Sequence, residues 1–274
     1  MRLRLIIQPN LHSLRMTIAI LFVLLLSACS AVVKVSQPDA PLLSVAQAER
    51  GYAAVLDKHV NDKGEVDFSG LRDDKSSSGI KALESYVQTI AVTPLNAAPT
   101  ADARLAHMVN AYNALSMYND IASGIPASHA GLSKVTFFIL RKFEIGGVHM
   151  SLFTFENDII RKLDEPRIHF ALNCSAVSCP VLPLKPFGAA TLNDELDRET
   201  RAFFARPENL RVDDQKRIIY FNEILKFYTE DFTPRHAASL IAYAQRYTKQ
   251  RLPIDYSVAF SAYDWTVANS RRKP

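Results

Sequence analysis

Two cysteines in the middle of the chain, Cys174 and Cys179, are the residues whose type and spacing point most directly to chemistry. A disulfide between them needs Cα atoms about 5.5 Å apart, whereas five extended steps span about 17 Å. The loop must therefore fold back on itself, which the small side chains of Ser175, Ala176 and Ser178 permit. Closing so short a loop is expected to stabilise the fold by only about 2 kcal/mol.

A nucleophilic role for either thiol requires a histidine as base and a further side chain to orient that histidine. His169 precedes Cys174 by five residues, which is about 16 Å along an extended chain. It can act as the base only if the chain turns sharply after Asn173. His149, oriented by Glu144, is a second possible base. This hypothesis predicts a cysteine-dependent hydrolase or transferase-like domain.

Two further hypotheses give the cysteines other roles. One is a reversible redox pair, although Cys-x4-Cys lacks the Cys-x-x-Cys spacing that lowers a thiol pKa. The other is a non-catalytic module that binds an envelope protein or a small molecule and carries a structural disulfide. The candidate catalytic side chains are Cys174, Cys179, His169 and Glu156, and the candidate binding side chains are Asn110, Tyr112, Asn113, His149, Arg167 and Asn173.

Structural roles compete with each of these assignments. Asparagines inside a helix can bridge to a neighbouring loop, and a buried His169 can be satisfied by a backbone carbonyl. Glu156 can pair with Arg161. Near the end of the chain, the run 263–265 (Tyr-Asp-Trp) is expected to clamp the C-terminal segment onto the core.

Several classes of function lack their usual signals in the sequence. The seven histidines show no metal-binding spacing, and there is no Walker loop, dinucleotide fingerprint or Gly-x-Ser-x-Gly elbow. We therefore predict neither a metal nor a cofactor. Without residues 1–28, which hold three of the 32 basic residues and no acidic one, 29 basic residues face 28 acidic ones. This near-neutral balance argues against nucleic acid as a partner.

The first 28 residues have the layout of an export signal. Arg2, Arg4 and Arg15 precede an apolar run over 18–26 that is about half the roughly 20 residues needed to span a bilayer. The run ends in Leu26-Ser27-Ala28-Cys29, which resembles a lipobox, so Cys29 is predicted to carry the lipid anchor. Because no aspartate follows Cys29, we expect the periplasmic side of the outer membrane.

Residues 29–42 contain two prolines and no helical period, so they are expected to form a lipid-anchored tether before a single domain over 43–274. Helices are predicted near 44–60, 80–90, 102–121, 151–161, 191–204, 222–230 and 236–248. Strands are predicted at 66–68, 143–145, 148–150, 168–172 and 217–221, with a Gly146-Gly147 hairpin turn that sets Glu144 across from His149. The expected fold class is α+β, a helix-rich domain on a small, mostly antiparallel sheet.

Five separated motifs resemble a known family, the domain of unknown function 547, over about residues 50–269. They are the runs 110–115, 151–161, 166–174 and 178–180, together with Tyr263-Asp264-Trp265. The resemblance implies little about activity, because the family was catalogued without a function; glutaredoxin-like domains fused to some members hint at thiol chemistry. The chain departs from the family at His107-Met108, where members usually carry Phe-Trp, and at Asn157, where a histidine commonly follows the glutamate.

Overall fold

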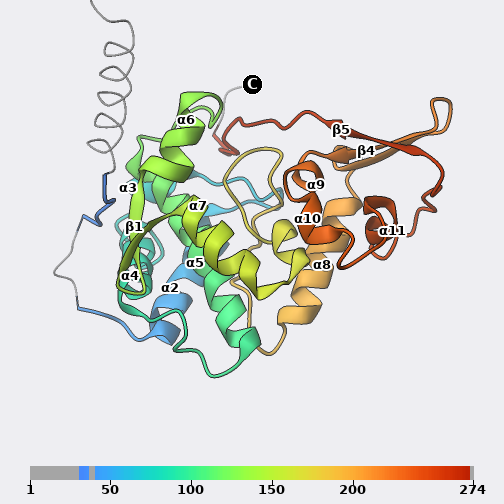
Figure 1. Ribbon diagram of the computed structural model, residues 1–274. Helices are drawn as coiled ribbons and strands as arrows, with labels where there is room; N and C mark the ends of the chain where they lie inside the picture. The colour runs from blue at the N-terminus through green and yellow to red at the C-terminus, as the bar shows by residue number, and fades with distance from the viewer. Residues whose placement is uncertain (1–30, 37–40, 272–274) are drawn as a thin grey trace, which may run out of the picture.

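Three helices build the first half of the fold, because their apolar residues recur at helical spacing. α2 (Val45–His59) starts at the predicted capping box of Ser44 and Gln47, and packs on α4 (Ile80–Val92). α5 (Ala101–Ala122) is buried around its whole circumference from Leu105 to Asp120. It is therefore the central helix, as Figure 1 shows. The computed structural model describes residues 31–36 and 41–271.

The predicted hairpin is confirmed. β1 (Lys142–Ile145) and β2 (Val148–Ser151) pair antiparallel with Glu144 opposite His149. Gly146 and Gly147 form the turn with φ values of 60° and 83°, a region that glycine adopts without a steric penalty.

The segment 31–36 does not run free as a tether. Val32 pairs in parallel with Lys142, so this segment lies beside β1 at the edge of the hairpin (Figure 1). Ser36 donates to the carboxylate of Glu84 on α4, and the Tyr118 hydroxyl donates to the carbonyl of Lys34. Residues expected to be a loose linker are thus part of the fold.

Short helical turns replace two predicted strands. Of the strand expected at 66–68, Val66 forms only isolated bridges, and Phe68 starts α3 (Phe68–Asp73). The strand expected at 168–172 is wrong: the 3-10 helix η4 (Pro166–Phe170) covers most of it. Glu165 accepts a bond from the backbone N–H of Arg167 and so caps this helix, and proline at the first position has its φ already fixed for a helix.

The chain between α5 and η4 consists of short helices around the hairpin. The predicted Ser151 cap is confirmed, because its hydroxyl accepts from the Thr154 N–H; the helix that follows is α-helical for one turn only and then widens into a π-helix. In chain order these elements are α6 (Leu132–Val135), η1 (Thr136–Leu140), α7 (Leu152–Thr154), η2 (Phe155–Ile160) and η3 (Arg161–Leu163).

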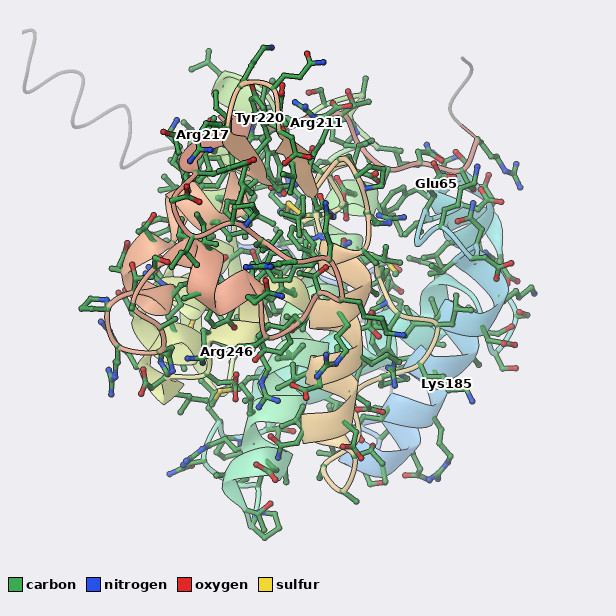
Figure 2. The ribbon with its side chains drawn as sticks, turned by 90° about the vertical axis from the view of Figure 1, so that its right-hand side faces the viewer. Glu65, Lys185, Arg211, Arg217, Tyr220 and Arg246 are labelled. Atoms are coloured by element: carbon green, nitrogen blue, oxygen red, sulfur yellow. A yellow bond between two sulfur atoms is a disulfide. The ribbon has the colours of Figure 1, made fainter. Side chains whose placement is uncertain are left out.

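The second half combines helices with a three-stranded sheet. The sheet has the order β3-β4-β5, with β3 antiparallel and β5 parallel to β4. Figure 2 shows Arg211 and Tyr220 on this sheet, where the guanidinium lies 4.1 Å from the ring centre. The predicted helix over 222–230 is split in two, and that over 236–248 is shorter. The elements are α8 (Leu192–Phe204), β3 (Leu210–Asp213), β4 (Ile218–Asn222), α9 (Ile224–Phe227), α10 (Thr229–Phe232), α11 (Leu240–Ala244) and β5 (Ser257–Ser261).

Two apolar clusters form the core of this α+β fold. The larger one joins α2, α4, α5 and the hairpin, and the smaller, rich in phenylalanine, joins α8 to the three-stranded sheet and α11. The loop that carries both cysteines lies where the two clusters meet. Across residues 31–36 and 41–271, the structure has no helix with the length and apolar character needed to cross a membrane.

Candidate functional site

The predicted disulfide is present between Cys174 and Cys179, whose Cα atoms lie 6.2 Å apart. The chain turns back as the sequence required, and Asn173 holds that turn. Its side-chain oxygen accepts from the N–H of Ser175 at 2.7 Å, and its amide donates to the carbonyl of Pro180 at 2.7 Å. The loop is therefore closed by side-chain hydrogen bonds as well as by the sulfur bond.

Asparagines of α5 fix the position of this loop relative to the core. Asn113 donates to the carbonyl of Ala171 at 3.0 Å and accepts from the N–H of Asn173 at 2.8 Å. Asn110 makes the same pair of bonds to the backbone of Phe187. Both side chains are buried, and each uses its amide donor and its carbonyl acceptor to bond backbone groups of a loop. They therefore hold the loops in place rather than face a cavity.

The sulfur of Cys179 accepts two hydrogen bonds. The N–H of Cys174 lies 3.0 Å from it, and the hydroxyl of Tyr263 lies 3.1 Å from it. Burial and the nearby charge of Glu156 raise the pKa of Tyr263 well above its usual value. The tyrosine therefore remains protonated and can donate at any ordinary pH.

Both cysteines line a small cavity of about 60 Å³ that also contains His169, Glu156 and Tyr263. A wider cleft of about 360 Å³ adjoins it, because the two share Phe138, Glu156, Phe227, Tyr228 and Trp265. Apolar side chains of α6, η1 and α7 form much of the outer wall of this cleft. The sulfur pair thus lies at the inner end of an apolar approach.

Glu156 lies between tyrosine hydroxyls at the junction of cavity and cleft. Its carboxylate accepts from Tyr112 at 2.9 Å and also from Tyr228. Burial, followed by the charge of Glu156, raises the pKa of both tyrosines. The site therefore holds a buried carboxylate that is stabilised by neutral donors.

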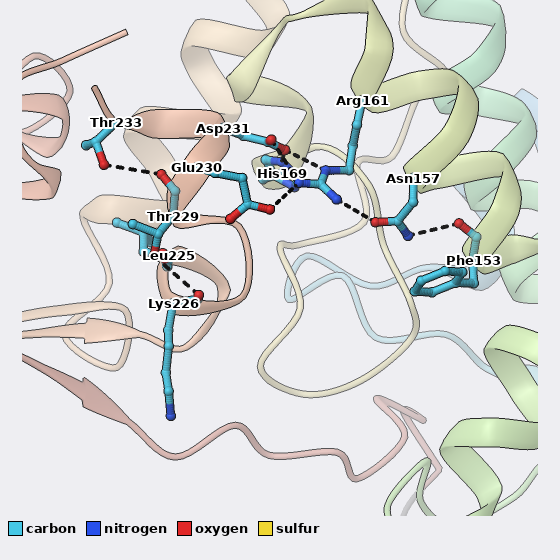
Figure 3. A network of polar contacts seen from close by, with 10 residues as sticks. All are labelled: Phe153, Asn157, Arg161, His169, Leu225, Lys226, Thr229, Glu230, Asp231 and Thr233. Atoms are coloured by element: carbon cyan, nitrogen blue, oxygen red, sulfur yellow. Dashed lines mark hydrogen bonds and ion pairs between the residues drawn. The ribbon is translucent and has the colours of Figure 1, made fainter. Parts of the chain in front are cut away.

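His169 forms a pair with Asp231, with Nε2 at 2.7 Å from Oδ2 (Figure 3). Arg161 donates to the same carboxylate at 2.6 and 2.8 Å, and to Asn157 at 2.6 Å. Burial opposes ionisation, but the bonds from His169 and Arg161 hold the pKa of Asp231 well below its usual range. Because an ionised carboxylate only accepts, Nε2 must carry the proton, and a neutral His169 has its acceptor at Nδ1.

Two sequence candidates lie away from this cavity. His149 is exposed on β2 opposite Glu144, and Arg167 is engaged by Glu165 and Asp197. Tyr112, Glu156, His169 and the cysteines are brought together, whereas Asn110, Asn113 and Asn173 organise the loops around them. The catalytic and binding roles of these residues stay predictions.

Sequence reasoning missed Tyr228 and Asp231, which the second half of the chain contributes, and it gave Tyr263 and Trp265 only a structural role. Each lies more than 50 residues beyond His169, with no spacing that links it to the cysteines. The local motif Tyr263-Asp264-Trp265 was the only available signal. It indicated a clamp, whereas the ring of Tyr263 also lines the cavity.

Sequence reasoning also missed a fully buried pair, in which Asp120 Oδ1 lies 3.1 Å from His129 Nε2. Burial raises the pKa of Asp120, and Ser175 of the cysteine loop lies close to its carboxylate. Ser175 has a φ of 62°, which non-glycine residues adopt mainly when their surroundings hold them there.

Across the described ranges, no three His, Cys, Asp or Glu side chains are grouped so that they could hold a metal ion. Residues 97–204 match the family described as Protein of unknown function, DUF547, which supports the resemblance seen in the motifs. The match includes α5, the hairpin, the cysteine loop and α8, but Tyr228, Asp231 and Tyr263 lie beyond it. No curated protein and no solved structure matches the chain.

Proposed function

We propose that Cys174 and Cys179 form a redox-active disulfide, and that the domain exchanges disulfides with thiols that enter the cavity. One observation carries the proposal: Cys179, which lines the cavity, has a sulfur that accepts hydrogen bonds from the Cys174 N–H and the Tyr263 hydroxyl. Donors to a sulfur favour its thiolate form, and a thiol of lower pKa is the better leaving group in exchange. Cys179 is thus prepared to leave as a thiolate.

The exchange proceeds in two balanced steps. A substrate thiolate attacks the sulfur of Cys174 and forms a mixed disulfide, while the Cys174–Cys179 bond breaks and its electron pair goes to Cys179. A second substrate thiolate then attacks the substrate sulfur and releases Cys174. Two thiols are oxidised to one disulfide, and the protein disulfide is reduced to a dithiol. Nδ1 of His169, which lines the cavity, accepts the proton of the incoming thiol.

A purely structural role explains the position of this disulfide poorly. It closes a short loop, worth about 2 kcal/mol, and the loop already has other attachments. Val177 and Ser178 donate backbone bonds to Thr266 and Asp264, and Asn222 donates to the carbonyl of Ser178 at 3.1 Å. The sulfur bond adds little to these restraints, yet it lies on a cavity wall.

The adjoining cleft indicates the class of substrate. Most of its lining side chains are aromatic or aliphatic, with Phe153, Trp265 and Ile139 among them, while Lys134, Glu156, Asn157 and Arg161 are its polar members. Burying apolar surface is favourable by about 25 cal/mol per Å². The cavity beside the sulfurs is narrow, so it admits a thiol on a slender chain. We therefore expect thiols attached to an apolar body, such as a cysteine flanked by apolar residues in a peptide.

Thiol exchange with defined reagents tests the proposal. The Cys29→Ser chain contains no cysteine other than the pair, so every adduct can be assigned. Phenylmethanethiol should reduce the disulfide faster than 2-mercaptoethanol at equal thiolate concentration, and acid-quenched peptide mapping should find the adduct on Cys174. Adducts on Cys179 would contradict its assignment as the leaving group. Resistance to both thiols in the folded protein would instead favour a non-catalytic binding module with a structural disulfide.

We further propose that the chain is a lipoprotein anchored through Cys29 on the periplasmic side of the outer membrane. The lipobox-like tetrad supports the anchor, and the paired segment 31–36 supports a short connection to the domain. Only Ser30 lies between Cys29 and Ala31, and two extended steps along the chain allow about 7 Å. The domain would then be held close to the lipid surface.

Labelling of cells with radioactive palmitate tests this localisation. Wild-type chain should carry the label and sediment with outer-membrane vesicles in a sucrose gradient, whereas the Cys29→Ser chain should lose the label. Label retained by the variant, or sedimentation with the inner membrane, would contradict the assignment.

A further inference from the structure

A second pocket, of about 360 Å³, lies on another part of the molecule. It is formed by the start of α2, the loop after α4, the start of α5 and the segment 187–189, and it shares no lining residue with the disulfide cavity. Its walls are largely apolar, with Val45, Pro94, Ala103 and Phe187 among them. Its size is that of a small-molecule site.

His107 gives this pocket an unsatisfied polar group. The side chain lines the pocket and is 7% exposed, and neither ring nitrogen has a hydrogen-bond partner among the described residues. Buried polar groups are nearly always bonded, because an unpaired one costs about 1 to 3 kcal/mol. Burial also lowers the pKa of His107. A neutral imidazole offers one acceptor nitrogen and one donor.

Glu49 supplies a second polar group to the same pocket. Burial raises its pKa, and no cation among the described residues lies within ion-pair distance of its carboxylate. A half-buried carboxylate without a counter-ion is costly. A charged ligand group of opposite sign would remove that cost.

We propose that this pocket binds a small organic amine, with an ammonium group that donates to the Glu49 carboxylate and to the acceptor nitrogen of the neutral His107 ring. The Glu49 carboxylate and one nitrogen of His107 are both acceptors, so a ligand group with several donors, such as an ammonium, can bond to both. The apolar walls select a hydrocarbon body attached to the amine. Binding here is independent of the disulfide, since the two pockets have separate walls.

Titration calorimetry with 2-phenylethylamine tests the site in the full-length chain. Saturable binding at one site per chain is expected, at least tenfold weaker in Glu49→Gln and in His107→Phe. The uncharged analogue 2-phenylethanol should bind at least tenfold more weakly than the amine. Glu144→Gln and His149→Phe, which change an exposed glutamate and an exposed histidine of the hairpin, should bind as wild type.

Equal affinity for the amine and the alcohol would overturn the proposal, as would undiminished binding in Glu49→Gln or no saturable binding at all. Glu49→Gln keeps the size of the side chain, so its folding can be verified by an unchanged melting curve. Should His107→Phe fail to fold, His107→Gln replaces it and is expected to weaken binding by a smaller factor than Phe.

Discussion

Replacing Tyr263 by phenylalanine should make the disulfide harder to reduce. The change removes one hydroxyl, which lies 3.1 Å from the sulfur of Cys179 and 3.6 Å from that of Cys174. The same ring stays packed against Trp265 and Phe227. The perturbation is thus confined to the hydroxyl and its contacts with the two sulfurs.

The size of the effect follows from the charge that develops on Cys179. A hydrogen bond to a charged group contributes about 1.5 to 3 kcal/mol, and the neutral sulfur of the disulfide accepts more weakly. Half of that range, about 0.75 to 1.5 kcal/mol, is retained as the difference between the two redox states, which equals about 16 to 32 mV for a two-electron couple. The reduction potential of Tyr263→Phe should therefore be about 16 to 32 mV more negative than that of the parent.

Equilibration in glutathione or dithiothreitol buffers, followed by alkylation with a maleimide polymer, measures the potential in the Cys29→Ser background. Tyr220→Phe is the matched control, because Tyr220 lies on β4 beside Arg211 and does not line the cavity. An unchanged or less negative potential in Tyr263→Phe would refute the assignment of Cys179 as the stabilised thiolate.

Three further changes test how the site is held. Replacing both cysteines by serine should lower the unfolding free energy in urea by about 2 kcal/mol without loss of the fold; complete unfolding would show that the disulfide is essential. Asn113→Ala should cost more, about 2 to 4 kcal/mol, since two buried backbone groups lose their partner; a loss under 1 kcal/mol would contradict this. Asp231→Asn should lower the unfolding free energy at pH 7 by about 2 kcal/mol, because the ionised Asp231 carboxylate has a lowered pKa in the folded protein. This contribution is fully present above the ordinary carboxyl pKa near 3.9, and it is lost as the pH falls below that value. The difference from wild type should therefore shrink in acid melts, and a constant difference would be evidence against the ion pair.

The elements with strong local signals could be predicted from the sequence. Ser44 and Gln47 predicted the start of α2, and Gly146-Gly147 predicted the hairpin turn. Both features depend only on residues a few positions apart. The strand predicted at 168–172 was wrong because its local pattern was misleading. Its alternating apolar residues fit a strand, but His169 between them is buried too, and Pro166 favours a helical start.

Only part of the candidate site could be predicted from the sequence. Residue type alone indicated four members of the site, Cys174, Cys179, His169 and Glu156. The sequence also showed that His169 can reach the cysteines only if the chain turns sharply after Asn173. Asp231 and Tyr228 come from α10 and from the residue just before it, and Tyr263 lies after β5. Their approach depends on packing between the two apolar clusters, which no local spacing encodes. The same applies to the contact between Asp120 and His129.

The central claim is that the disulfide is redox-active, and its equilibrium reduction potential tests that claim most directly. The measurement uses the folded Cys29→Ser chain at pH 7 in graded dithiothreitol buffers, with alkylation of Cys174 and Cys179 as the readout. We predict a potential less negative than about −300 mV, the range of exchangeable disulfides. A potential more negative than about −300 mV would place the bond among structural disulfides and contradict the proposed function.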